Sequence, residues 1–162
     1  MTTGLCTETL LIRPLQVAEI HQCVEGAVLF HREFNMPGKL IPSVFTRNWT
    51  NFLTTQIARI FSAWRGDDLV GGLGGLVHPD LNDDRIVATE MFWFVMPHER
   101  DRPGSMTAVR LLKQFMQWGD AHAVETRLAH MVGGGNDAQL DRLYRKLGYQ
   151  QLEVGYYRPR RE

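Results

Sequence analysis

The chain has 162 residues, of which 44% are hydrophobic and 22% charged, and its 18 basic residues balance its 18 acidic ones. This length suits one ordinary domain with a sizeable core, and the composition excludes a disordered tail. A formal net charge of zero argues against nucleic acid or anionic lipid as a partner. We therefore expect a single domain that covers residues 1–162.

The cysteines and the N-terminal segment bear on the compartment. Cys6 and Cys23 are the only cysteines and have no CxxC spacing, which suggests a reducing compartment. The N-terminus lacks the basic region and long apolar run of a signal peptide. No apolar run approaches the roughly 20 residues that span a bilayer. We therefore expect a cytoplasmic protein without a membrane partner.

The six histidines show no HxxxH spacing and no cluster with cysteine, so no metal site is expected. His78 ends a predicted strand, and His98 borders the segment that follows another. Both are interpreted as surface-loop residues, and a second catalytic base is the alternative.

The first half of the sequence predicts a strand, two helices and a hairpin. The strand covers 9–15, and apolar residues at helical spacing predict a helix over 16–34. A second helix follows, with Ser43 as its N-cap. Strands over 59–65 and 69–78 form the hairpin. The four glycines in its second strand suggest a β-bulge or the close approach of another part of the chain.

The second half predicts a mixed α/β (α+β) fold with a mostly antiparallel sheet flanked by helices. The expected elements are a buried central strand over 86–96, a helix over 105–118 capped by Gly119, a strand over 125–132, a helix that begins at Asn136 or Asp137 and is closed by Gly148, and two short strands within 149–160.

The segment between the central strand and the next helix predicts an anion site. The first backbone N–H groups of a helix have no helical partners, and the helix dipole favours negative charge there. Gly104 permits close approach to the backbone, Arg100 and Arg102 can donate charge-assisted hydrogen bonds, and Ser105 and Thr107 add hydroxyls. These features suit a diphosphate, and an ordinary solvated loop is the alternative. Neither a GxxxxGK[ST] nor a GxGxxG motif is present.

The sequence as a whole resembles the GNAT superfamily of N-acetyltransferases. The segment 11-LIRPL-15 is similar to the family's first strand, and 144-YRKLGY-149 matches its C-terminal helix motif. Val95, Pro97, Arg100 and Gly104 correspond to the family's V-x-P-x-x-R-G-x-G-x-G/A turn. Gly104 comes one residue late, after a proline that has no N–H to donate.

This resemblance implies acetyl transfer from acetyl-CoA to a primary amine of a small molecule or protein by direct attack, without a metal. It also allows a homodimer. A strand-four backbone amide, at Val95 or Met96, would polarise the thioester carbonyl. The residues that the resemblance assigns to the cofactor are Val95, Met96, Arg100, Arg102, Gly104, Ser105, Met106, Thr107 and Asn136.

Glu90 is the candidate general base. It is the only carboxylate in its predicted strand, and alternation places it on one face with Phe92, Phe94 and Met96. Apolar surroundings raise the pKa of a carboxyl group, which suits a base near neutral pH. The alternative is an exposed Glu90, or one paired with Arg85.

Tyr144 fills the family's general-acid position, from which its hydroxyl would protonate the leaving thiolate. The alternative is a core tyrosine that only packs. For the chain as a whole, the alternative to an enzyme is a non-catalytic acyl-CoA-binding regulatory or structural module, and a third interpretation is an interaction domain without a ligand.

Overall fold

The computed structural model describes residues 8–129, 137–152 and 156. The chain divides into two compact units, residues 1–129 and 130–162. The first carries the sheet and most of the helices, and the second carries one described helix. Within the described residues, no helix is both long and apolar enough to cross a membrane.

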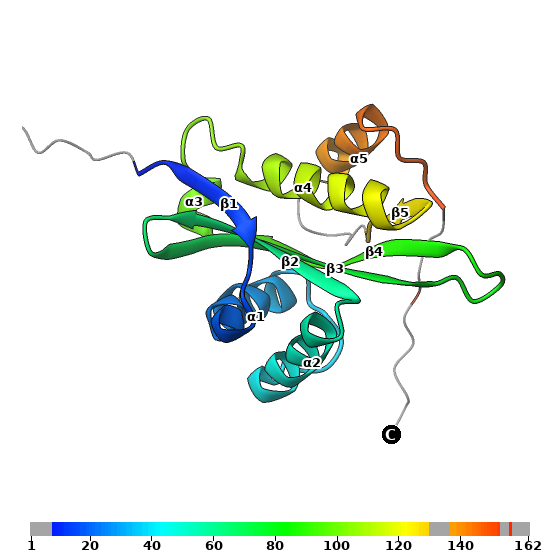
Figure 1. Ribbon diagram of the computed structural model, residues 1–162. Coiled ribbons are helices and arrows are strands. Elements are labelled where there is room, and N and C mark those ends of the chain that lie inside the picture. Colours follow the sequence, from blue (N-terminus) through cyan, green and yellow to red (C-terminus); the bar gives the residue numbers. More distant parts are fainter. Residues whose placement is uncertain (1–7, 130–136, 153–155, 157–162) are drawn as a thin grey trace, which may run out of the picture. The chain divides into compact units, whose positions relative to one another are not determined.

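A five-stranded sheet forms the centre of the first unit, in the order β1-β2-β3-β4-β5 (Figure 1). Neighbouring strands are antiparallel from β1 to β4, and β5 is parallel to β4. The strands are β1 Leu10–Pro14, β2 Ala58–Arg65, β3 Asp68–Pro79, β4 Ile86–Val95 and β5 Glu125–Arg127. The predicted mixed, mostly antiparallel sheet is confirmed.

Helices cover both faces of this sheet (Figure 1). α1 and α2 lie on one face, and α4 lies on the other. The helical segments are the 3₁₀ helix η1 Val17–Gln22, α1 Cys23–Glu33, α2 Pro42–Thr54, α3 Pro97–Arg100, α4 Thr107–His122 and α5 Asp137–Lys146.

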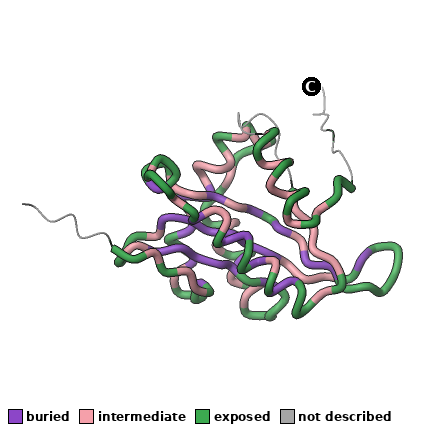
Figure 2. The backbone as a smooth tube through the Cα atoms, turned by 90° about the horizontal axis from the view of Figure 1, so that it is seen from above, coloured by how far each residue is buried: buried purple, intermediate pink, exposed green. Residues whose placement is uncertain are grey.

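The core of the first unit has two layers, because the sheet is covered on both faces (Figure 2). On the α1 and α2 side, Trp49 packs edge-on against Phe92 with ring centroids 5.0 Å apart. On the α4 side, Leu111, Leu112 and Phe115 are fully buried. Burying each such side chain contributes about 1.5–3 kcal/mol, so these layers dominate the stability of the unit.

The glycines of β3 let both helical layers approach the sheet. A Cβ added to Gly74 would lie 2.5 Å from the Trp49 ring, and one added to Gly75 would lie 2.6 Å from the Phe115 ring. β3 also has a bulge beside these glycines, because Gly71 pairs with Ala63 and Leu69 with Trp64, which leaves Val70 as the additional residue. The close approach and the β-bulge predicted for this strand are therefore both confirmed.

Several predicted boundaries are wrong for local reasons. α2 starts at Pro42, with Ile41 and not Ser43 at the N-cap, because the fixed φ of proline suits the first helical position. α4 continues through Gly119 to His122, because Gly119 is needed where the helix packs on Thr126 of β5. The helix predicted from residue 16 begins instead as the 3₁₀ helix η1.

The strands predicted near the C-terminus lie only partly within the described residues. β5 ends at Arg127, well before residue 132, and residues 128–129 form no strand. Residues 149–152 and 156, which belong to the segment predicted to hold two short strands, form no strand. The remaining predicted strand residues lie outside the described part of the chain.

Candidate functional site

The middle of β4 contains a β-bulge. Phe92 pairs with Gly74 of β3, whereas the next pair joins Glu90 to Gly75, so Met91 is the additional residue. The Met91 side chain is 51% exposed, although the residues on either side of it are buried. A bulge bends its strand and re-aims nearby side chains, and it is a frequent feature next to functional sites.

The bulge puts Glu90 and Phe92 on opposite faces of the sheet. Directly opposed residues of an antiparallel pair share a face, and a Cβ on Gly75, the partner of Glu90, would point at Phe115 of α4. Phe92 instead packs on Trp49 of α2. The predicted alternation, which placed Glu90 on the aromatic face, is therefore wrong.

Glu90 is nonetheless deeply buried, at 5% exposure. One of its oxygens accepts a hydrogen bond from the Ala129 backbone N–H at 3.1 Å. Burial raises the pKa of Glu90 to about 7, and the Ala129 hydrogen bond offsets only part of that rise. The alternative pairing with Arg85 is wrong, because that guanidinium binds Asp83 at 2.7 Å and Glu125 at 3.2 Å.

Beyond its short pairing with β5, one edge of β4 is open within the described part of the chain. β5 pairs only with Val87–Thr89, so residues 90–95 have no described strand on that side. Met96 donates its backbone N–H to the Val70 carbonyl of β3 at 2.9 Å. Because N–H directions alternate along a strand, the Val95 amide points to the open edge. Of the two amides predicted to polarise a thioester carbonyl, only that of Val95 has this direction.

The segment between α3 and α4 contains a tight turn. Ser105 donates its backbone N–H to the Arg102 carbonyl at 3.1 Å, with Pro103 and Gly104 at the central positions. Gly104 has φ +70°, as the third residue of a type II turn requires. A Cβ added to Gly104 would meet nothing within 4 Å among the described residues. The open space that a phosphate would need is therefore present beside the backbone.

A buried carboxylate, Glu99, holds this turn together. It accepts hydrogen bonds from Arg65 at 2.8 and 3.0 Å, from Thr107 at 2.6 Å and from Ser105 at 3.1 Å. Arg102 lies 3.3 Å from it. The Arg65 hydrogen bonds, together with those from the two hydroxyls, lower the pKa of Glu99 to about 2 against the opposing effect of burial.

Sequence reasoning missed Glu99 and assigned the two hydroxyls directly to a diphosphate. Both hydroxyls instead donate to the Glu99 carboxylate. Thr107 is fully buried, so its side chain is part of the turn's framework. The local sequence gives no sign that Glu99 holds the turn together, because its main partner, Arg65, lies far away in the sequence, on β2.

The two arginines of the turn differ in their contacts. Arg100 forms a two-bonded ion pair with Glu33 at the end of α1, at 3.0 and 2.5 Å. Arg102 is 39% exposed, and its Nε lies 3.3 Å from Glu99 Oε2, an oxygen that already accepts a hydrogen bond from Arg65. Arg102 is therefore the more available cation beside the α4 N-terminus.

The start of α4 has the geometry of an anion site. The first bond of the helix runs from the Arg110 N–H to the Met106 carbonyl at 2.9 Å. The N–H groups of residues 107–109 lie before it, where a helix offers donors without helical partners. Met106 is the N-cap residue, and its side chain is 54% exposed.

Tyr144 lies in the second unit, on α5. Gly148, at φ +90°, ends this helix. Gly148 donates its N–H to the Arg145 carbonyl and Tyr149 donates to the Tyr144 carbonyl, each at 3.0 Å, which is a Schellman motif. The Tyr144 and Tyr149 rings pack edge-to-face with centroids 6.2 Å apart. The YRKLGY pattern thus has a structural cause of its own. Asn136 lies outside the described residues.

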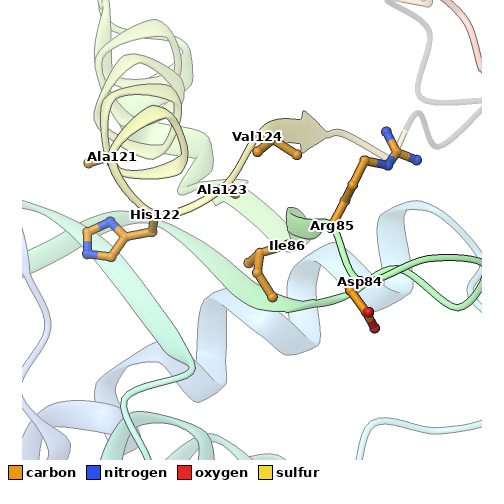
Figure 3. A pocket seen from close by; sticks show the side chains of 7 residues that line it. All are labelled: Asp84, Arg85, Ile86, Ala121, His122, Ala123 and Val124. Atoms are coloured by element: carbon orange, nitrogen blue, oxygen red, sulfur yellow. The ribbon is translucent and has the colours of Figure 1, made fainter.

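A hollow of about 450 Å³ lies at the opposite end of β4 from the turn (Figure 3). It lies between the residues that start β4 and those that follow α4, including Ile86, His122 and Val124. Its charged side chains, Asp84 and Arg85, point in different directions (Figure 3). The hollow therefore offers no convergent set of binding groups, and within the described residues no cluster of His, Cys, Asp or Glu could hold a metal ion.

The fold matches solved structures over nearly the whole chain, at 13–18% sequence identity. A predicted acetyltransferase with acetyl-CoA from Clostridium acetobutylicum has a TM-score of 0.73 and 13% identity, over 93% of this chain and 96% of that one. AAC(6')-Iy in complex with the bisubstrate analogue CoA-S-monomethyl-acetylneamine has a TM-score of 0.70 and 18% identity, over 94% and 99%. A transcriptional regulator from Bacillus halodurans has a TM-score of 0.73 and 17% identity, over 93% and 99%.

These similarities define the class of fold: the chain has the GNAT-type acetyltransferase fold. The likeness at these identities extends to the fold and not to a particular activity. No model of a protein family matches the sequence, and a comparison with curated proteins finds no match.

Proposed function

We propose that this protein transfers an acetyl group from acetyl-CoA to a primary amine by direct attack. The observation that supports this most is the open β4 edge, which carries a buried Glu90 and leads into the turn at the α4 N-terminus. In this proposal, acetyl-CoA lies along that edge. The Val95 amide binds the thioester carbonyl, and the α4 N-terminus with Arg102 and the Gly104 backbone binds the diphosphate.

Proton transfer in this proposal uses Glu90 and Tyr144. Glu90 accepts a proton from the amine, because a carboxyl group with a pKa of about 7 is populated in both forms near neutral pH. Tyr144 donates a proton to the leaving thiolate. Asn136 is retained as a cofactor contact on the strength of the sequence resemblance.

A small-molecule amine is the acceptor class that we place first, ahead of a protein amine. Two structural neighbours are aminoglycoside acetyltransferases, and one of them is in complex with sisomicin. The acceptor panel therefore includes sisomicin, simple alkylamines and lysine peptides. Release of CoA thiol from acetyl-CoA, followed with a thiol reagent, measures turnover of each acceptor.

Cofactor binding is tested separately by calorimetry with acetyl-CoA. Gly104→Glu places a carboxylate in the open space beside the turn, and Arg102→Glu reverses the more available charge, so both should weaken binding. His21→Gln, an exposed change in η1, is the control. Wild-type protein that gives neither heat nor a thermal shift with acetyl-CoA would contradict the proposal.

The second candidate is a non-catalytic acyl-CoA-binding regulatory module. Two observations favour it: a neighbour described as a transcriptional regulator, and a turn whose hydroxyls serve the fold through Glu99. Binding of acetyl-CoA without turnover of any acceptor in the panel would support this module over the enzyme.

A further inference from the structure

His78 and Thr89 form a hydrogen-bonded pair on adjacent strands. His78 lies within β3 and is half-buried, so its interpretation as a surface-loop residue is wrong. Its Nδ1 lies 2.9 Å from the Pro79 carbonyl oxygen, and its Nε2 lies 2.9 Å from the Thr89 hydroxyl. A carbonyl oxygen only accepts, so Nδ1 carries a hydrogen. In the neutral ring, Nε2 therefore accepts a hydrogen bond from the Thr89 hydroxyl.

This chain of contacts has the order of a catalytic relay: a hydroxyl, an imidazole that can take its proton, and a carbonyl that orients the imidazole. Thr89 is the last residue of β4 that pairs with β5, opposite Arg127. The backbone of Thr89 therefore lies where the two strands part and the open edge of β4 begins.

Thr89 and Glu90 are adjacent in sequence and face opposite sides of the sheet. Thr89 pairs with Leu76, which packs against the core under α2. Glu90 pairs with Gly75, which faces α4. One point on β4 thus presents two groups that can accept a proton, one to each face.

A cationic amine would not be repelled from the Thr89 side. Arg127, the β5 partner of Thr89, binds Asp80 at 2.6 Å and Glu125 at 2.6 Å, so two carboxylates neutralise its guanidinium. Asp80 accepts hydrogen bonds from Asn82 and Arg127, and these lower its pKa to about 2. The Asp80 carboxylate is therefore ionised near neutral pH.

The chemistry of the proposed function needs two proton acceptors. An alkylamine arrives almost entirely as an ammonium ion near neutral pH. It loses one proton before its nitrogen attacks the thioester carbon and a second from the tetrahedral adduct. The C–S bond then breaks and the thiolate takes up one proton, so one proton is released to water overall.

We propose that the Thr89–His78 pair accepts the first of these protons. The Thr89 oxygen takes a proton from the ammonium as its own hydroxyl proton passes to His78 Nε2, which leaves a neutral hydroxyl and an imidazolium. The nitrogen then attacks the thioester carbon, and the second proton passes through water at the open edge to Glu90 on the other face. The C–S bond breaks and Tyr144 protonates the thiolate. His78 and Glu90 each return one proton to water and Tyr144 regains one, so one proton is released overall. This inference rests on the proposed acetyl transfer.

The test compares two acceptors of similar size, ethylamine and trifluoroethylamine. The first is protonated near neutral pH and the second is largely neutral, so only the first needs the early deprotonation. His78→Gln should lower kcat/KM for ethylamine by roughly 10²–10⁴-fold and leave trifluoroethylamine nearly unchanged. The KM for acetyl-CoA should not change.

Variants of the hydroxyl separate the relay from packing. Thr89→Val, of nearly the same shape, should reproduce the loss, and Thr89→Ser, which keeps a hydroxyl, should retain activity. Combining Thr89→Val with His78→Gln should cost little more than either alone, because the two residues act as one unit. His21→Gln is the matched control. If the wild type acetylates only amines larger than ethylamine, a second test applies. Added imidazole should then restore the acetyl-transfer activity of His78→Ala, measured with the best acceptor.

Two failures are distinguishable. Wild-type protein that acetylates no amine overturns the proposed function and this inference with it. The inference alone is overturned if the wild type is active and one of three results follows: His78→Gln loses activity equally with both small amines, His78→Gln keeps full activity, or imidazole does not rescue His78→Ala. His78 would then be a histidine that only stabilises the sheet.

Discussion

Glu90 and Glu99 are both buried carboxylates of the first unit, at 5% and 0% exposure, yet their surroundings shift their pKa values in opposite directions. Glu99 has a paired guanidinium and two hydroxyls around it. Among the described residues, Glu90 accepts a hydrogen bond from the Ala129 N–H and has no ion-pair partner. Burial raises the pKa of both, but only Glu99 has partners strong enough to reverse the effect, so their pKa values are about 2 and about 7.

The difference separates a structural charge from a chemical one. Glu99 stays ionised across the physiological range and holds β2, the turn and the start of α4 together. Glu90 changes its protonation state near neutral pH, which is the property that a general base needs. Burial alone therefore does not identify a catalytic carboxylate; the number and charge of its partners do.

Removing the ionisable group at Glu90 should give the largest effect on activity. Glu90→Gln keeps the shape and an acceptor for the Ala129 N–H but cannot take up a proton. We expect kcat/KM to fall by roughly 10²–10⁴-fold, with acetyl-CoA binding by calorimetry nearly unchanged. Glu25→Gln, an exposed change on α1, should have no effect. An unchanged rate in Glu90→Gln would make Glu90 a structural residue like Glu99.

Removing Glu99 should give the largest effect on stability. Glu99→Ala leaves Arg65 without its carboxylate in a mostly buried position, and losing one partner of a buried pair costs about 3–5 kcal/mol. Urea unfolding of the wild type and the variant measures this difference. A loss below about 1 kcal/mol would mean that solvent reaches Arg65 readily and that the turn does not depend on Glu99.

The two carboxylates should also give stability opposite dependences on pH. The pKa of Glu90 is raised from 4.5 to about 7 in the folded state, so its ionisation opposes folding. This cost is absent below about pH 4.5 and grows up to about pH 7, to a size on the order of 3 kcal/mol. Glu99 has a lowered pKa, so its contribution is present above about pH 4.5 and is lost as pH falls towards about 2.

Glu90→Gln tests this prediction, since it should remove the loss of stability between about pH 4.5 and 7 without altering the acid limb. Unfolding free energies measured across that range give the difference directly. Parallel curves for the wild type and the variant would contradict the raised pKa of Glu90. Glu25→Gln should follow the wild type throughout.

The sequence was sufficient for strands β1 to β4 and helices α1, α2 and α4, because hydrophobic periodicity and glycine signals are local. It did not predict the bulge at Met91, which reverses the face of Glu90. One extra residue in a strand leaves no trace in alternation when both faces are apolar. The burial and raised pKa of Glu90 were predicted, although the face was not.

The turn shows why site contacts are harder to predict than site position. The segment before α4 was placed correctly, and Gly104 has the positive φ that glycine favours. The partners of its side chains come from distant strands and helices: Arg65 from β2 for Glu99 and Glu33 from α1 for Arg100. Such pairs depend on tertiary packing, which a local motif does not encode.

The ion pair between Arg100 and Glu33 should have the smallest effect on stability and a measurable one on the cofactor. Its side chains are 44% and 38% exposed, so solvent screens the pair, and Glu33→Gln should cost less than about 1 kcal/mol. The same change frees the Arg100 guanidinium at the edge of the candidate anion site. Acetyl-CoA should then bind more tightly at low salt, and the gain should shrink as salt increases.

Asp83→Asn is the matched control, because it breaks an exposed pair with Arg85 at the other end of β4. It should leave the affinity for acetyl-CoA unchanged at every salt concentration. Arg100→Ala should weaken binding if the guanidinium moves from Glu33 to a phosphate. If Glu33→Gln and Arg100→Ala both bind acetyl-CoA as the wild type does, Arg100 only ties α3 to α1, and the charge for the diphosphate comes from Arg102 and the α4 N-terminus.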